Sequence, residues 1–403
     1  MKQHYSIVKR KKHFEALRAW EPVKLIIRPE EIFDIRNPLY PLCENLFYKC
    51  RDLYQKMPLR KNGFDSFLHP INVIANLKNS GVTDQITLLC GLMHDYIEEI
   101  VDLYKAEKKL NEDDLSSRQI LDEYEVKQVI LFETELNEFC TKNNIDTDVV
   151  EKIIETIKLL TRLKRDYYYK SISYIFNCKD PEVRERAIQI KLADRIHNIM
   201  SIECFDESGR LYQCFKNLFI INSAKQFLID LYGVDVFDWR YSKEAKATER
   251  LFTHCGKATY SAYLVITNLA SKNGLENVKS LLQLAFKKYK LEHAGLWAIT
   301  DFEDETHPMR LYQGIIRKWD ARLHHEWQEW KRRVADEKKF CLQFFSEYDF
   351  SEKQIQAILD YKDAYSLKEV VSYLLYDNDY VLTSFLSRQL DGRGRLRGVG
   401  LEK

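Results

Sequence analysis

The scarcity of helix-breaking residues constrains the fold of this chain more than any other feature of its sequence. It contains 13 glycines and 8 prolines in 403 residues, and long segments repeat apolar side chains every three to four positions. That repeat is the period of an α-helix with one buried face, whereas the alternating pattern of β-strands occurs in few, short stretches. The sequence therefore predicts an all-α protein.

Charge and cysteine content exclude several classes of protein. Lysine plus arginine number 62 and aspartate plus glutamate 61, so no overall field attracts the chain to nucleic acid or acidic lipid. The nine cysteines include no C-x-x-C pair, which argues against a disulfide framework or a zinc finger. The N-terminus lacks the apolar core of a signal peptide, and no segment is apolar for long enough to cross a bilayer. We expect a cytoplasmic protein with no membrane association and no strong nucleic-acid signal.

Changes in the pattern divide the chain into four parts. Residues 1–35 form a charged lead-in, and residues 36–235 carry all the chemical motifs. The helical pattern breaks around residues 234–242, where we place a domain boundary. Residues 240–390 are predicted as a second helical domain of unknown role, a candidate site for a protein partner, and residues 391–403 as a flexible basic tail. The sequence does not indicate an oligomeric state.

Capping residues locate the ends of the predicted helices. Asp180-Pro181 is an N-cap followed by a first-turn proline, and Gly233 is a typical residue to end a helix. We place further N-caps at Thr83, Asp148, Ser351 and Ser366. The predicted helices include Pro41–Tyr54, Glu112–Ile120, Val126–Thr141, Val149–Leu163, Leu211–Tyr232, Thr259–Leu269, Glu276–Tyr289 and Tyr312–Ala335.

The segment Leu88–Ile100 joins an apolar run to four side chains that bind metals or protons. On one helix, His94 and Glu98 are four residues apart, and Asp95 precedes Glu98 and Glu99 by three and four residues. All four side chains would then project into one cleft. Three acids beside a histidine repel one another strongly, and a bound cation relieves that repulsion. The alternative is an amphipathic helix whose acidic face meets water.

Two distant stretches supply side chains of the same kind. His69-Pro70 begins a helical pattern, and Asp194 lies in Lys191-Leu192-Ala193-Asp194-Arg195-Ile196-His197-Asn198. A histidine beside a proline, a His-Asp pair and a distant helical aspartate form the ligand set of the HD phosphohydrolases. The sequences of the three motifs resemble, more particularly, the hydrolase domain of the RelA/SpoT family, over roughly residues 40–235. Members of that family remove the 3′-pyrophosphate from the alarmone (p)ppGpp.

The resemblance implies an HD-domain helical bundle that holds one divalent cation. Its ligands would be His69, His94, Asp95 and Asp194. Two imidazoles and two carboxylates suit Mn²⁺ best, with Mg²⁺ or Fe²⁺ as alternatives. Four protein ligands leave positions for water and for a phosphate oxygen, so the cation would neutralise the phosphate and acidify the attacking water.

The same resemblance assigns a catalytic role to an acidic pair. Glu98 and Glu99 match the residues that orient and deprotonate the nucleophilic water in the family. Glu99 stands where the family most often has aspartate, and the added methylene shifts its carboxylate. We expect this difference to change the rate and leave the type of reaction the same.

Basic and amide side chains are expected to hold the nucleotide. Arg60 and Lys61 precede His69 by nine and eight residues, where the family places its nucleotide contacts. Lys191 and Asn198 lie one turn before and after Asp194 and are interpreted in the same way. Ser66-Phe67 replaces the Pro-Tyr that usually precedes the family's histidine, which leaves the base pocket undefined. We interpret His197 as structural, on the ground that it lies off the face of Asp194.

Two other functions stay open. The chain could be an HD phosphohydrolase for another nucleotide, or a catalytically weak nucleotide sensor with the C-terminal helices as its output module. The complete ligand set favours an enzyme over a sensor. The signature segments of the synthetase domain found in long RelA/SpoT enzymes do not occur in residues 240–403.

Overall fold

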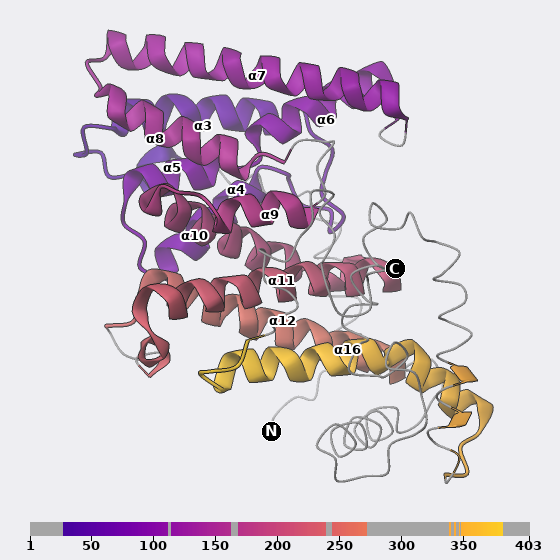
Figure 1. Ribbon diagram of the computed structural model, residues 1–403. Coiled ribbons are helices and arrows are strands. Elements are labelled where there is room, and N and C mark those ends of the chain that lie inside the picture. Colours follow the sequence, from indigo (N-terminus) through magenta and orange to yellow (C-terminus); the bar gives the residue numbers. More distant parts are fainter. Residues whose placement is uncertain are drawn as a thin grey trace, which may run out of the picture.

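The computed structural model describes residues 27–111, 114–162, 168–238, 244–271 and 348–381, with a few positions between 338 and 346. All regular elements in these ranges are helices, which confirms the all-α prediction. The helices are stacked in successive layers from α7 at one end to α16 at the other (Figure 1). Their bounds are α2 Pro29–Ile32, α3 Tyr40–Tyr54, α4 Leu68–Asn79, α5 Gln85–Met93, α6 Tyr96–Lys108, α7 Leu115–Lys142, α8 Thr147–Leu160, α9 Tyr168–Phe176, α10 Pro181–Ile199, α11 Glu207–Tyr232, α12 Ala247–Ser271 and α16 Glu352–Tyr376, with short 3₁₀ turns η1 Ile202–Cys204 and η2 Val234–Phe237.

Helix α10 lies at the centre of the stack. It packs against α4, α5, α8, α9, α11 and α12, and apolar side chains are buried around it from Val183 to Ile199. At Gly91 of α5, an added Cβ would lie 2.7 Å from Leu77 of α4 and 3.9 Å from Ile190 of α10. The glycine therefore permits α4, α5 and α10 to converge, and these are the helices that bring the predicted metal ligands together.

The helix ends follow local capping chemistry, with corrections at the predicted caps of α5 and α8. Asp180 caps α10 through the amide of Val183, as predicted, and α11 ends at Gly233 with φ +78°. The cap of α5 is Asp84, one residue after Thr83, and the cap of α8 is Asp146, two residues before Asp148. In both places a carboxylate closer to the first free amides accepts their hydrogen bonds.

Two predicted pairs of helices are single helices. Helix α7, Leu115–Lys142, covers the predicted helix Val126–Thr141 and residues 115–120 of the predicted helix Glu112–Ile120, and α16 continues from the Ser351 capping box through Ser366. No glycine or proline lies between the members of either pair. The acidic, mixed pattern suggests a break within α7, and the Ser366-x-x-Glu369 capping-box pattern suggests a new start within α16, but neither feature ends a helix. In α7 the apolar residues surround the helix, and Val126 and Ile130 are 48% and 57% exposed.

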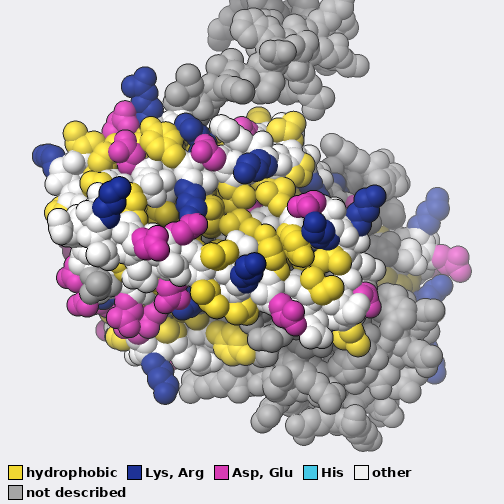
Figure 2. Space-filling view, turned by 90° about the horizontal axis from the view of Figure 1, so that it is seen from above, with side chains coloured by type: hydrophobic (Ala, Val, Ile, Leu, Met, Phe, Trp, Pro, Cys, Tyr) yellow, Lys and Arg dark blue, Asp and Glu magenta, His cyan; other side chains and the backbone are white. Residues whose placement is uncertain are grey.

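The outer face of α7 leaves apolar surface uncovered by the described residues. Figure 2, seen from the α7 side, shows apolar side chains gathered across this face between charged ones. A groove of about 800 Å³ runs beside it, lined by residues of α7, α8 and α9 that include Val129, Leu159 and Tyr174. Helix α7 thus buries only part of its apolar surface against its neighbours α6 and α8.

The two described helices beyond residue 240, α12 and α16, pack on the centre of the molecule. Helix α12 lies against α10 and α11, and α16 lies against α12 and α11. An added Cβ at Gly256 would be 2.5 Å from Leu375, so α16 approaches α12 closely at this position. Apolar residues of α12 and α16 belong to the same buried cluster as those of α10. The division near residue 240 stays a prediction, and these contacts do not mark it as a gap between two cores.

Several predictions fall outside the described residues. They are the helices Glu276–Tyr289 and Tyr312–Ala335, most of the lead-in 1–35 and the tail 391–403. In the described part of the chain, none of the helices combines the length and the apolarity that crossing a membrane requires.

Candidate metal centre

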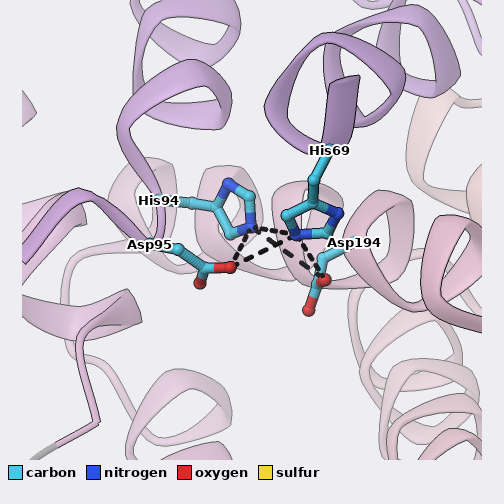
Figure 3. Close-up of side chains that lie close together, drawn as sticks. All are labelled: His69, His94, Asp95 and Asp194. Atoms are coloured by element: carbon cyan, nitrogen blue, oxygen red, sulfur yellow. Dashed lines mark hydrogen bonds and ion pairs between the residues drawn. The ribbon is translucent and has the colours of Figure 1, made fainter. Parts of the chain in front are cut away.

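Four side chains from three separate segments meet beside α10. His69 comes from the first turn of α4, His94 and Asp95 from the junction of α5 and α6, and Asp194 from the last turns of α10 (Figure 3). One donor atom from each lies within 4.8 Å of the others. Both histidines and Asp194 are buried, and Asp95 is partly buried. The structure therefore brings together all four predicted metal ligands.

The donor atoms face a common point. The Nε2 atoms of His69 and His94 are 3.2 Å apart, and each lies 3.0–3.2 Å from Oδ2 of Asp95. Oδ1 of Asp194 is 3.4 Å from Nε2 of His69 and 3.9 Å from that of His94. Ligand atoms at adjacent positions of an octahedral cation lie about 3 Å apart when each bond is about 2.1 Å long. The donor set and its spacing fit one divalent cation.

The His-Asp pair lies between two helices, which corrects the prediction of one helix through Leu88–Ile100. Helix α5 ends at Met93, and Asp95 has φ −106° and ψ 3° before α6 begins at Tyr96. The carbonyl of Asp95 accepts the amide of Glu99 at 2.9 Å, so Asp95 serves as the N-cap of α6 through its backbone. Glu98 and Glu99 consequently occupy the first turn of α6, where the helix dipole favours acidic side chains.

A hydrogen bond sets the orientation of His94. Its Nδ1 lies 2.8 Å from the carbonyl oxygen of Gly91, one turn earlier. The carbonyl can only accept, so Nδ1 carries the proton and donates it. In the neutral ring Nε2 is then unprotonated and available as a ligand.

The segment before His69 belongs to the core. Phe67 is buried, and its ring packs against Phe47 at 5.4 Å and Tyr54 at 6.1 Å between centroids. The hydroxyl of Ser66 donates to the carbonyl of Pro58 at 2.5 Å. The Ser66-Phe67 pair therefore anchors the start of α4 and thereby places His69, and the aromatic ring of Phe67 faces the interior.

Lys191 and Asn198, predicted as nucleotide contacts, hold Asp194 from both sides. The Lys191 ammonium lies 3.1 Å from Oδ2 of Asp194, and the Asn198 amide donates to its Oδ1. Arg60 extends this hydrogen-bond network, because its guanidinium donates to Oδ1 of Asn198 at 2.9 Å. The loop that carries Arg60 is thus tied directly to α10 beside the ligand cluster.

Lys61 lies farther from the cluster than its neighbour Arg60. Its side chain is exposed, and its ammonium is 4.5 Å from the centroid of the Phe205 ring. The contact recorded for Lys61 is therefore with an aromatic ring and not with the ligands or their hydrogen-bond partners.

Without a cation, a proton on His94 partly balances the negative charges of Asp95 and Asp194. Burial disfavours the charged imidazolium and lowers the pKa of His69. Burial acts in the same direction on His94, but the carboxylates of Asp95 and Asp194 outweigh it and raise the pKa of His94 to about 8. Burial opposes ionisation of Asp95, yet the two imidazoles hold the pKa of that carboxyl well below its usual value. A cation in the centre would displace the His94 proton.

The two acids of the predicted catalytic pair lie in different surroundings. Glu98 lines the cavity beside the cluster and accepts the backbone amide of Arg162 at 2.8 Å. Burial, together with the charges of Asp95, Asp102 and Glu98, raises the pKa of Glu99 to about 8. Glu98 is therefore fixed toward the cavity, and Glu99 holds a proton at neutral pH unless a cation lies nearby.

A polar cavity of about 150 Å³ opens next to the ligands. Asp95 and Asp194 form part of its wall, and positively charged side chains lie around it. Its lining also includes Glu98, Arg162, Tyr168, Lys191, Arg195, Asn198 and Lys216. The combination of paired acids with lysine and arginine side chains suits an anion that is bound beside a cation.

His197 is the residue near the cluster that the sequence interpretation missed. Its Nδ1 lies 2.8 Å from Nδ1 of His69, although we expected it to lie off the face of Asp194. Residues three apart on a helix are neighbours on its surface, so the spacing from Asp194 to His197 already contained the signal. Burial lowers the pKa of His197 to about 3, which keeps its ring neutral.

No protein-family model, curated protein or solved structure matches this chain.

Proposed function

We propose that this protein is a metal-dependent phosphohydrolase of the HD type that acts on a guanosine nucleotide resembling (p)ppGpp and releases its 3′-pyrophosphate. The observation that carries the proposal is the convergence of His69, His94, Asp95 and Asp194 on one point. The three motifs that supply these ligands are the ones that resemble the RelA/SpoT hydrolase domain.

The ligand residues would hold one divalent cation, with Mn²⁺ as the best fit to two imidazoles and two carboxylates. Bound there, such a cation supplies Lewis acidity that neutralises phosphate charge and acidifies water. Two sets of contacts hold the proposed ligands in position for this cation. The carbonyl of Gly91 accepts a hydrogen bond from Nδ1 of His94 and so orients Nε2 toward the site. Lys191 and Asn198 hold the Asp194 carboxylate.

Glu98 is the stronger candidate for the general base. Its carboxylate faces the cavity, and the amide of Arg162 fixes one of its oxygens at 2.8 Å while the other stays available to take a proton from water. Glu99 lies in the same turn of α6 beside Asp95 and supports the negative charge of the site once a cation lowers its affinity for a proton.

The size of the cavity restricts which part of the nucleotide enters it. Its volume of about 150 Å³ is smaller than the roughly 300–1,000 Å³ of pockets that enclose whole ligands. The cavity accommodates the phosphate portion, where Lys191 is within reach. The nucleoside would then extend toward the loop of residues 57–66, where Arg60 and Lys61 lie.

A second candidate is an HD phosphohydrolase that acts on another nucleotide. The observation that favours it is the burial of Phe67 in the core, because the family's usual Pro-Tyr pair is absent at this position. The chemistry of the metal centre would be the same in both cases, and the base pocket would differ.

Incubation of the protein with Mn²⁺ and ppGpp, followed by anion-exchange separation of the products, tests the proposal. We expect GDP and intact pyrophosphate from the wild type, and no reaction from the D194N variant. A D235N variant, altered at an exposed position on η2, serves as the matched control. Inorganic phosphate as the first product would refute pyrophosphate release, and turnover of other nucleotides without turnover of ppGpp would favour the second candidate.

Kinetics of two variants separates catalysis from binding. E98Q should lower kcat with little change in KM or metal content, because a base acts mainly in the transition state. R60A should raise KM, because Arg60 would bind the substrate and the transition state equally. An E98Q enzyme with unchanged kcat would remove Glu98 from the mechanism.

A further inference from the structure

Two residues from one turn of α10 contact both nitrogens of the same imidazole. Oδ1 of Asp194 is 3.4 Å from Nε2 of His69, and Nδ1 of His197 is 2.8 Å from Nδ1 of His69. The rings of His69 and His197 have centroids 5.0 Å apart and planes inclined by 37°, so they do not stack face to face. The contact between them is made through their nitrogen atoms.

One proton must lie between the two Nδ1 atoms. At 2.8 Å, two unprotonated nitrogens would direct their lone pairs at each other, and two protonated ones would clash. Either His69 donates to His197 or the reverse. The other nitrogen of His69 decides between these arrangements once a cation is bound, because its Nε2 faces Nε2 of His94 and both ligand carboxylates, where the cation would lie.

A nitrogen that binds a cation must be unprotonated, and a neutral imidazole carries its single proton on the other nitrogen. When Nε2 of His69 is a ligand, the proton of His69 is therefore on Nδ1. This proton points at Nδ1 of His197, which must then be an acceptor, with the proton of His197 on its Nε2.

We propose that His197 is a positioning residue: it accepts a hydrogen bond from Nδ1–H of His69 and so fixes the tautomer and ring orientation that expose Nε2 to the cation. This inference rests on the proposed metal site. The position of His197 corresponds to that of Gly91 at the other histidine, where the carbonyl accepts from Nδ1 of His94. Each imidazole of the cluster is thereby oriented from behind by one acceptor.

Two substitutions distinguish this role from simple packing. H197N places an amide oxygen, which can accept a hydrogen bond, near the position of Nδ1. H197F keeps an aromatic ring and provides no acceptor. Outer hydrogen-bond partners of ligating histidines typically account for about 10–100-fold in metal affinity. We expect H197F to weaken Mn²⁺ binding by about that factor and H197N to restore most of it, as measured by titration with detection of free Mn²⁺ by EPR.

The tautomer can be read directly in the wild-type protein, independently of any variant. Two-bond ¹H–¹⁵N spectra of ¹⁵N-histidine-labelled protein saturated with diamagnetic Zn²⁺ should show His69 protonated at Nδ1 and His197 protonated at Nε2. A His69 ring protonated at Nε2 in the loaded protein would overturn the inference. So would equal losses of affinity in H197N and H197F. A wild type that binds no cation would overturn the proposed function together with this inference, whereas a wild type that binds cation and fails either test above would overturn this inference alone.

Discussion

Substitution of Glu99 by glutamine should change how the stability of the metal-free protein depends on pH. Burial, with Asp95, Asp102 and Glu98 nearby, raises the pKa of Glu99 from 4.5 to about 8. Between these values the folded protein retains a proton that the unfolded chain releases. The free energy of unfolding therefore falls as the pH rises, by about 1.4 kcal/mol for each pH unit. From about pH 5 to pH 8 the loss is on the order of 4 kcal/mol, and E99Q, which has no proton to lose, escapes it.

Urea unfolding in EDTA at several pH values measures this effect as the difference between E99Q and the wild type. The difference should grow in favour of E99Q as the pH rises. Saturating Mn²⁺ should reduce the slope of the wild type, because a nearby cation stabilises the ionised carboxylate. The exposed Glu107 on the same helix offers the control E107Q, which should follow the wild type. A constant difference between E99Q and the wild type from about pH 5 to 8 would refute the reasoning about burial and charge at Glu99.

Three further outcomes follow from the packing and charges. G91A should lower the free energy of unfolding by about 1–3 kcal/mol in chemical denaturation, because its Cβ would lie 2.7 Å from Leu77; unchanged stability would contradict the close approach of α4 and α5. Apparent Mn²⁺ affinity should fall about tenfold for each pH unit below pH 8, because the proton on His94, with its pKa of about 8, competes with the metal; calorimetry that finds no dependence on pH would disprove this competition. A chain that ends at Asp238 should unfold at a much lower temperature than the full chain, because α12 and α16 cover apolar side chains of α10 and α11; equal melting temperatures would show that these helices contribute little.

Helix content and the ligand set could be predicted from the sequence, because both depend on local or strongly constrained chemistry. The period of apolar residues requires helices, and the Asp180-Pro181 pair begins one at the observed position. The four proposed ligands are predictable because two imidazoles and two carboxylates occur in motifs of one known combination. Their convergence is a tertiary property that the resemblance implied and the periodicity alone did not.

The errors have local physical causes. The chain bends at His94–Asp95, because the backbone of Asp95 caps a new helix there, and apolar periodicity does not register such a turn. Helix α7 was divided in two because its apolar residues surround the helix and show no single buried stripe. The prediction for His197 places it on the wrong face of its helix, and its contact with His69 depends on α4 packing against α10.

The roles assigned to Lys191 and Asn198 illustrate a different limit. In the sequence, a lysine and an asparagine one turn from a metal-binding aspartate could bind either the substrate or the aspartate side chain itself. The structure places both on the carboxylate of Asp194. Lys191 also lines the cavity, so its interaction with Asp194 leaves room for a contact with substrate.

Stoichiometric Mn²⁺ binding tests the central claim most directly. Equilibrium dialysis followed by elemental analysis should find one Mn²⁺ per chain for the wild type and for D235N, and a large loss for D194N, because Asp194 is one of the four proposed ligands. Circular dichroism of D194N confirms that the comparison is made on folded protein. Equal occupancy of wild type and D194N, or no bound Mn²⁺ in either, would contradict the metal centre described here.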